Sequence, residues 1–218
     1  MQTSERRQKL NDMVVTIELT LLSVIQGTAL YFLANSSYGP ILSLDYAHWI
    51  YIAIGFIVLI TFWSQALVHV LSFISWPLEF IHNFLYFAVI ISEIVLFVSI
   101  TDPLRWFAAS TGFFFVSGLL YWADLRLLKN KEPNFVGESQ KVFYMKNLND
   151  QMFSMTYLVP AGFSFSLIAT ALVWRYPQIF IAGNWHLLLG FLQFAFAAGA
   201  LAYLLPKFKS TIKLIEFL

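Results

Sequence analysis

Six long apolar stretches separated by short polar segments constrain the fold of this chain more than any other feature of its sequence. A helix of about 20 predominantly apolar residues is long enough to cross the hydrocarbon core of a bilayer. The predicted spans, with edges defined to within roughly 2–4 residues, are 13–34, 47–73, 78–100, 104–123, 153–174 and 185–205. We therefore expect an all-α, polytopic integral membrane helix bundle with six transmembrane helices.

The composition agrees with a membrane protein and excludes several other classes. Charged residues make up 11% of the chain, against about 25% in a typical soluble domain, and the mean hydropathy is +0.72. A formal net charge of +1 gives no reason to expect a nucleic-acid partner. Because the chain has no cysteine, disulfides, thiolate metal sites and cysteine nucleophiles are excluded.

The positions of the basic residues predict the orientation in the membrane. Three Lys or Arg residues precede the first span, five follow the fourth and three follow the sixth, which together are 11 of the 13 in the chain. Positive residues are enriched in cytoplasmic segments. With an even number of spans, both termini are therefore expected on the cytoplasmic side of a bacterial-type inner membrane.

This topology divides the chain into five parts. Residues 1–12 are a cytoplasmic N-terminal segment, 13–128 hold transmembrane helices one to four, and 129–152 are a cytoplasmic loop with an amphipathic helix. Residues 153–206 hold the last two transmembrane helices, and 207–218 are a basic cytoplasmic tail. The run 13–34 is longer than the core of a signal peptide, about 7–15 residues, so we expect it to remain as the first span.

The cytoplasmic loop contains one helical pattern. The segment from Lys129 to Gln151 begins with loop-like residues, and its second part has apolar residues at helical spacing. The apolar positions recur every three or four residues and are Val142, Met145, Leu148 and Met152. Such a helix lies on a membrane surface or against a cytosolic protein partner.

Small residues recur at helical spacing in the last two spans. Gly162, Ser166 and Thr170 are each four residues apart, as are Ala195 and Gly199. Faces of this kind let two helix backbones approach closely, within one chain or between chains. We therefore expect tight helix packing and a homo-oligomer.

A polar stripe runs along the third span, which is otherwise apolar. At about 100° per residue, Glu79, His82, Asn83 and Glu93 fall within one stripe roughly 100° wide. Lipid cannot satisfy these groups, so the stripe is expected to face other helices or a hydrated cavity. Glu93 is expected about 21 Å of helix rise beyond Glu79, deep in the membrane.

Polar residues of the neighbouring spans extend this stripe into a seam between helices one to three. Glu18 and His69 are expected near the cytoplasmic mouth, while Gln26 and Gln65 are neutral groups farther along their helices. Neither Lys nor Arg occurs within these three spans, so a buried carboxylate must be compensated by a proton, a cation, a histidine or water. The pattern predicts conduction, transport or sensing of protons or small cations, with Glu93 as the deep site.

A metal site at the cytoplasmic face is a second hypothesis. Glu79 and His82 have the Glu-x-x-His spacing that places both ligands on one helical face, and Asp124 at the end of span four completes a mononuclear site with His69. This site would support an integral membrane enzyme. Paired haem ligation by His69 with His82, and by His48 with His186, is a further option, but no motif indicates a cofactor.

Two other readings remain. The chain could be a sensor or anchor subunit that recruits a cytosolic partner through the segment from Lys129 to Gln151. The polar groups could also serve packing alone, since interfacial side chains can reach headgroups or cap helix ends. Signatures of serine hydrolases, zinc proteases, phosphate-binding loops and potassium filters are absent from the sequence, and no catalytic residue is assigned.

Overall fold

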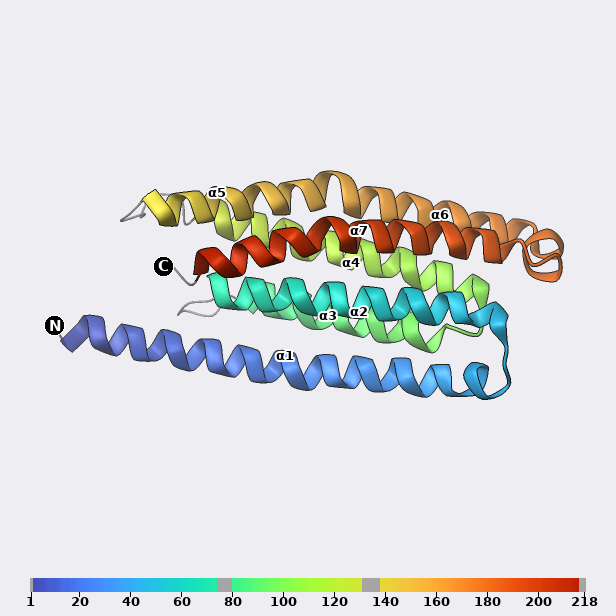
Figure 1. The fold of residues 1–218 in the computed structure, drawn as a ribbon, viewed down its shortest axis with the longest axis horizontal. Coiled ribbons are helices and arrows are strands. Elements are labelled where there is room, and N and C mark those ends of the chain that lie inside the picture. The colour runs from blue at the N-terminus through green and yellow to red at the C-terminus, as the bar shows by residue number, and fades with distance from the viewer. Residues whose placement is uncertain (1, 74–79, 131–137, 216–218) are drawn as a thin grey trace.

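The computed structural model describes residues 2–73, 80–130 and 138–215, and these form a bundle of long helices aligned along one axis (Figure 1). No strand occurs in these ranges. The elements in chain order are α1 Gln2–Leu42, α2 Tyr46–Phe73, α3 Phe80–Val98, α4 Pro103–Asn130, α5 Glu138–Phe153, the π-helical turn η1 Ser154–Leu158, α6 Val159–Arg175, the π-helical turn η2 Gln178–Ala182 and α7 His186–Ile215.

Six helices among the described residues are long and apolar enough to cross a membrane, which confirms the predicted all-helical bundle and is consistent with a multi-pass membrane protein. One of the six is the continuous rod formed by α5, η1 and α6. The loop helix expected at 140–152 is thus the first part of this rod and lies in line with α6 (Figure 1). Its predicted apolar positions Val142, Met145 and Met152 are exposed on the outside of the bundle, whereas Phe143 and Asn147 face inward.

The helices are arranged as a ring. α1 packs against α2 and α3, α3 against α4, α4 against α6, and α2 against α7. The ring closes where α6 meets α7, and in the described part of the chain these two helices touch at only a few positions. The start of α1 and the end of α7 lie at the same end of the bundle, here called the terminal end (Figure 1). The opposite end, where α1 turns into α2 and α3 into α4, is called the hairpin end.

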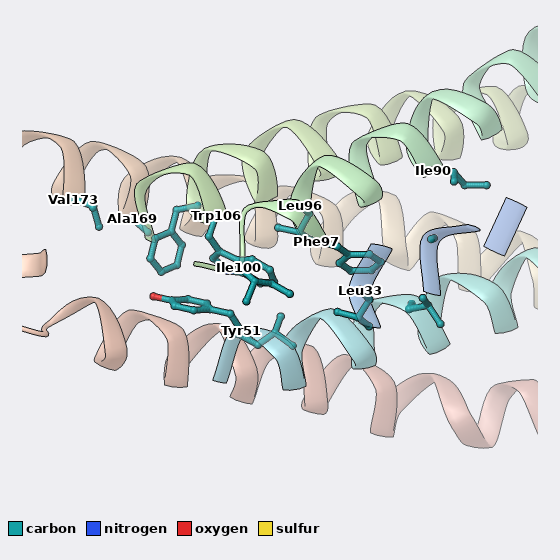
Figure 2. Packing of buried hydrophobic residues seen from close by; sticks show 13 residues of the cluster. Leu33, Tyr51, Ile90, Leu96, Phe97, Ile100, Trp106, Ala169 and Val173 are labelled. Atoms are coloured by element: carbon teal, nitrogen blue, oxygen red, sulfur yellow. The ribbon is translucent and has the colours of Figure 1, made fainter. Parts of the chain in front are cut away.

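Large side chains fill the middle of the ring toward the hairpin end. Tyr51, Phe97, Ile100 and Trp106 are fully buried there (Figure 2). Phe107 is fully buried in the same cluster. The rings of Tyr51 and Trp106 lie with centroids 5.1 Å apart, although they belong to α2 and α4. Aromatic pairs of this kind contribute packing beyond the burial of apolar area, so this half of the bundle is closed.

The hairpin between α3 and α4 shows how the sequence directs the chain at this end. Asp102 precedes Pro103, the first residue of α4, and its Oδ1 accepts the backbone N–H of Arg105 at 3.1 Å. This is an N-cap followed by proline at the first helical position, where the missing N–H costs nothing.

Gly162 and Thr170, two of the small residues of α6, pack against α4 of the same chain. A Cβ added at Gly162 would overlap the ring of Phe114, so glycine is required for this close approach of α6 to α4. Thr170 lies 3.4 Å from Thr111 across the same interface. By contrast, Ala195 and Gly199 lie on the exposed face of α7. A homo-oligomer through that face stays a prediction.

Candidate functional site

A cavity lies in the half of the bundle nearer the terminal end and encloses about 1000 Å³ of empty space, including open solvent. Helices α1, α2, α3, α4, α5 and α7 all contribute to its wall. Many of its lining side chains are polar or ionisable: Glu18, Gln65, His69, His82, Tyr86, Tyr121, Asp124, Asn147, Asp150 and Lys207. Most of these groups lie on segments far apart in the sequence, so only the tertiary fold brings them together.

Two histidines and an aspartate form the most concentrated group in this wall. His82 Nδ1 lies 2.6 Å from Asp124 Oδ1, and His69 Nδ1 lies 3.6 Å from Asp124 Oδ2. The two imidazole rings stack with centroids 4.6 Å apart. Asp124, which is 6% exposed, thus directs one carboxylate oxygen toward each of two stacked imidazoles contributed by α2 and α3. A buried carboxylate needs such partners because its ionised form is costly away from water.

The geometry of this group fits a metal ion. One ligand atom from each of His69, His82 and Asp124 can be chosen so that all three lie within 4.8 Å of one another. Two imidazole nitrogens and one carboxylate oxygen are a donor set that suits Zn²⁺ or Fe²⁺. Three protein ligands leave coordination positions open, which is typical of reactive or exchangeable sites and not of closed structural ones.

Two further polar pairs border the same space. Asn83 Nδ2 donates to Glu18 Oε1 at 3.0 Å, which joins α3 to α1. The hydroxyl of Tyr121 on α4 donates to Oε1 of Gln65 on α2. These pairs fix the side chains of Glu18 and Gln65 in the wall of the cavity.

The mouth of the cavity is crossed by a link between α5 and α7. Lys207 on α7 donates to Asp150 on α5 and to the hydroxyl of Tyr203. Its ammonium also lies 4.0 Å from the centroid of the Tyr203 ring and 5.3 Å from that of Phe153. Opposite charge and ring faces both favour this position of the ammonium, so Lys207 is held over the entrance.

Glu93 lies deeper than the cavity wall and is 0% exposed. Its polar neighbours are Gln26 of α1 and Tyr86 of α3, and Tyr86 also lines the cavity. They approach one another without completing hydrogen bonds: both carboxylate oxygens of Glu93, the amide O and N of Gln26 and the hydroxyl of Tyr86 are buried and unpartnered. Buried polar atoms of native proteins normally have partners, so these five unpartnered atoms are a second candidate site.

Polar groups at the hairpin end are already satisfied by each other. The hydroxyl of Tyr51 lies 2.8 Å from His186 Nδ1. Trp106 Nε1 donates to Gln193 Oε1 at 2.7 Å, and Gln193 Nε2 donates to Ser110 Oγ at 3.0 Å. His186 is therefore engaged with a tyrosine rather than paired with His48 across a haem. The stacking of His69 on His82 likewise leaves no room for a macrocycle between them.

The predicted site residues fall into two groups. Glu18, Gln65, His69, His82 and Asp124 surround one cavity. Gln26 and Glu93 form the separate buried pocket behind it. Glu79, expected as a metal ligand, lies outside the described residues. The seam expected among the first three spans extends to α4, because Asp124 bridges the two histidines.

Sequence reasoning missed several lining residues. Tyr86 and Tyr121 are two of ten tyrosines, and nothing in their spacing distinguishes them from aromatic belt residues. Asp150 and Lys207 are 57 residues apart, and periodicity carries no information on which charges pair across that distance. A usable signal was the polar run Asn147–Gln151, which continues the helix toward span five.

No protein-family model, curated protein or solved structure matches this chain.

Proposed function

We propose that this multi-pass membrane protein takes up small cations from the cytoplasm, as a carrier or sensor, with a transition-metal ion such as Zn²⁺ bound at His69, His82 and Asp124. The observation that carries the proposal is the convergence of three metal-binding side chains within 4.8 Å in the wall of an open cavity. The terminal end, which is nearer the cavity, is the end flanked by the basic residues. On the positive-inside rule, that end faces the cytoplasm.

The proposed route leads from the cavity toward the buried pocket. A cation or proton that enters past Lys207 meets Glu18 and the two histidines first. Tyr86 borders both spaces and links them, and Glu93 with Gln26 would be the inner station. Toward the hairpin end from Glu93, Tyr51, Phe97 and Trp106 are fully buried and packed into one cluster. Passage across the whole bundle would require these helices to rearrange, which favours a carrier or a sensor over an open pore.

A metal-binding measurement tests the first part of the proposal. Purified protein in nanodiscs is titrated with Zn²⁺ or Co²⁺, and the dissociation constant is compared between the parent and the variants Asp124→Asn and His82→Gln. We expect each variant to lower the affinity by about 10–100-fold or more. The matched control is His48→Gln, because His48 also contacts a carboxylate, Asp45 at 2.7 Å, but belongs to no three-ligand group among the described residues. Equal affinity in all four proteins would contradict the proposal.

A flux measurement separates carrier from sensor. Proteoliposomes loaded with a metal-sensitive dye report uptake by the parent and by Glu93→Gln. For a carrier, Glu93→Gln should slow uptake while leaving binding at the histidines unchanged. Binding without uptake in the parent would point to a sensor or to the second candidate below.

An integral membrane enzyme is the second candidate, and one observation favours it. The histidine–aspartate group lies in the wall of an open cavity, so a metal bound there could be reached by a second solute. A three-ligand metal would then activate water or polarise a substrate oxygen. Recruitment of a cytosolic protein stays a separate proposal, supported only by the exposed apolar residues Val142, Met145 and Met152 of α5.

A further inference from the structure

The cavity nearer the terminal end borders a second chamber that the proposed cation site does not use. This chamber encloses about 840 Å³, including open space, and lies between α2, α4, η1 and α7. The two spaces share six lining residues, so they lie next to each other on either side of these residues. The shared residues, here called the neck, are Phe62, Gln65, Ser117, Tyr121, Ser154 and Leu204.

The chamber differs from the outer cavity in its chemistry. Beyond the neck, its walls are almost entirely apolar and include Ile54, Leu96, Phe113, Phe196 and Ala200. Its few polar groups already have partners: Gln193 and Ser110 bond to each other, and Thr61 donates to a backbone carbonyl. A hydrophilic solute would find no partners there, and ordered water would find few. An apolar chain would bury its surface without loss of hydrogen bonds.

The neck supplies a polar group that lacks a partner. Ser117 is 5% exposed and lines both spaces, and its hydroxyl makes no hydrogen bond within the described residues. Ser117 thus places an unpartnered hydroxyl at the start of an apolar chamber. The histidine–aspartate group lies farther out, in the wall of the first cavity. This order of polar and apolar surface matches a molecule with a small polar head and a single hydrocarbon tail.

The length of the chamber suits one acyl chain. On α4 it extends from Tyr121 to Ser110, 11 residues or about 16 Å of helix rise. One leaflet of the hydrocarbon core is about 15 Å deep, which is the depth that one acyl chain spans.

A sideways entrance from the bilayer is available at the weakest join of the ring. Leu158 and Val159 on one side and Ala197 and Ala200 on the other line the chamber. They belong to η1–α6 and to α7, which touch at only a few positions among the described residues. A chain from the membrane can therefore reach the chamber by separating these two helices, without crossing the polar mouth.

We propose that the chamber binds the tail of a single-chain lipid amphiphile, such as a free fatty acid or a lysolipid, with its head at the neck near Ser117. This inference goes beyond the proposed cation function and does not require a bound metal. If the enzyme candidate holds, the amphiphile is the substrate class; if the carrier or sensor holds, it is a bound modulator.

Photolabelling in nanodiscs tests the proposal. The probe is palmitate with a diazirine near its terminal methyl group, and labelled positions are mapped by peptide mass spectrometry. We expect labels on chamber residues of α4 and α7, such as Phe113 and Phe196, and competition by unlabelled palmitate or by palmitoyl lysophosphatidylcholine. Whichever competes better identifies the head. Labels confined to outward residues such as Phe191 and Leu192, or competition by neither compound, would overturn the proposal.

Two variants and a matched control make the test specific. Ala200→Phe fills the chamber and Ser117→Leu blocks the neck, and each should reduce chamber labelling at least tenfold. Ala195→Phe adds the same bulk on the exposed face of α7 and should leave labelling unchanged. Unchanged labelling in two correctly folded chamber variants would overturn the proposal.

A readout of metal binding separates this inference from the proposed function. Asp124→Asn should lose metal affinity while its chamber labelling stays within twofold of the parent. Ala200→Phe should show the opposite pattern, with metal affinity kept and labelling lost. Loss of labelling in Asp124→Asn together with retention in Ala200→Phe would contradict the placement of the tail.

Discussion

The two halves of this bundle contain similar residue types and use them in opposite ways. At the hairpin end, histidine, glutamine, tyrosine and tryptophan satisfy one another beside an aromatic core, and the bonded pair Gln193 and Ser110 forms the inner end of the second chamber. At the terminal end, histidine, glutamine, tyrosine and carboxylates surround empty space, and Glu93 and Gln26 behind them have buried atoms without partners. Polarity inside a membrane bundle is therefore a poor guide to function by itself. Empty volume and unpartnered polar atoms distinguish a candidate site from a structural network.

The largest expected loss of stability comes from a substitution in the packed core at the hairpin end. Trp106→Ala removes a fully buried indole and leaves the amide of Gln193 without its donor. We expect a loss of about 3–5 kcal/mol in the free energy of unfolding, measured by denaturant titration in mixed micelles. The control is Trp122→Ala on the same helix, where the indole is 52% exposed and the loss should stay below about 1 kcal/mol. Equal losses would mean that the hairpin half is not the stabilising core.

The second prediction compares Gln193 and Glu93, two side chains of similar size. Replacing the first should lower the free energy of unfolding, and replacing the second should leave it unchanged or raise it. Gln193→Leu should destabilise the protein by about 1–3 kcal/mol, because Trp106 and Ser110 each lose a buried partner. Glu93→Leu should leave stability unchanged or raise it, because it removes an unpartnered buried carboxyl group. The same unfolding measurement serves both. A large destabilisation by Glu93→Leu would show that Glu93 is a structural partner.

The smallest predicted effect concerns two tyrosine hydroxyls. Tyr51→Phe removes a hydrogen bond to His186 inside the packed core and should cost about 1 kcal/mol. Tyr121→Phe frees Gln65 at the edge of the cavity, where water can replace the lost donor, so the cost should be below about 0.5 kcal/mol. The comparison fails if Tyr121→Phe is the more costly change, since that would mean that water does not reach the neck.

Much of the architecture follows from the sequence because membrane constraints are local. The apolar runs predict the six spans, and Asp102 with Pro103 predicts the start of α4. The polar stripe of α3 also lies as expected, since His82 and Glu93 are buried and Asn83 bonds to Glu18. Each of these inferences needs only helical geometry and the exclusion of polar groups from lipid.

The parts of the candidate site that the sequence did not predict depend on which helices become neighbours in the fold. Helical periodicity places Glu93 on the same stripe as His82, but it does not show that Asp124 of α4 would join His82 while Glu93 stays in another pocket. The pairing of Lys207 with Asp150 depends on α5 continuing in line with α6. The expected break between a surface helix and span five hid that continuity.

The π-helical turn η1 sets the direction in which the side chains of α5 point relative to those of α6. Eight positions separate Ser154 from Gly162, and in an unbroken α-helix they would point roughly 80° apart. Five residues wound at about 82° each instead bring them to within roughly 10° of the same direction. The π-turn therefore directs Ser154, which lines the cavity, and Gly162, which packs against α4, toward the same side of the rod. Deleting a single residue from η1 would leave seven positions, which an unbroken α-helix turns through about 700°. The rod could then become a regular α-helix and keep Asn147 and Asp150 within roughly 20° of their alignment with the wall, whereas a deletion elsewhere in α5 would turn them by about 100°.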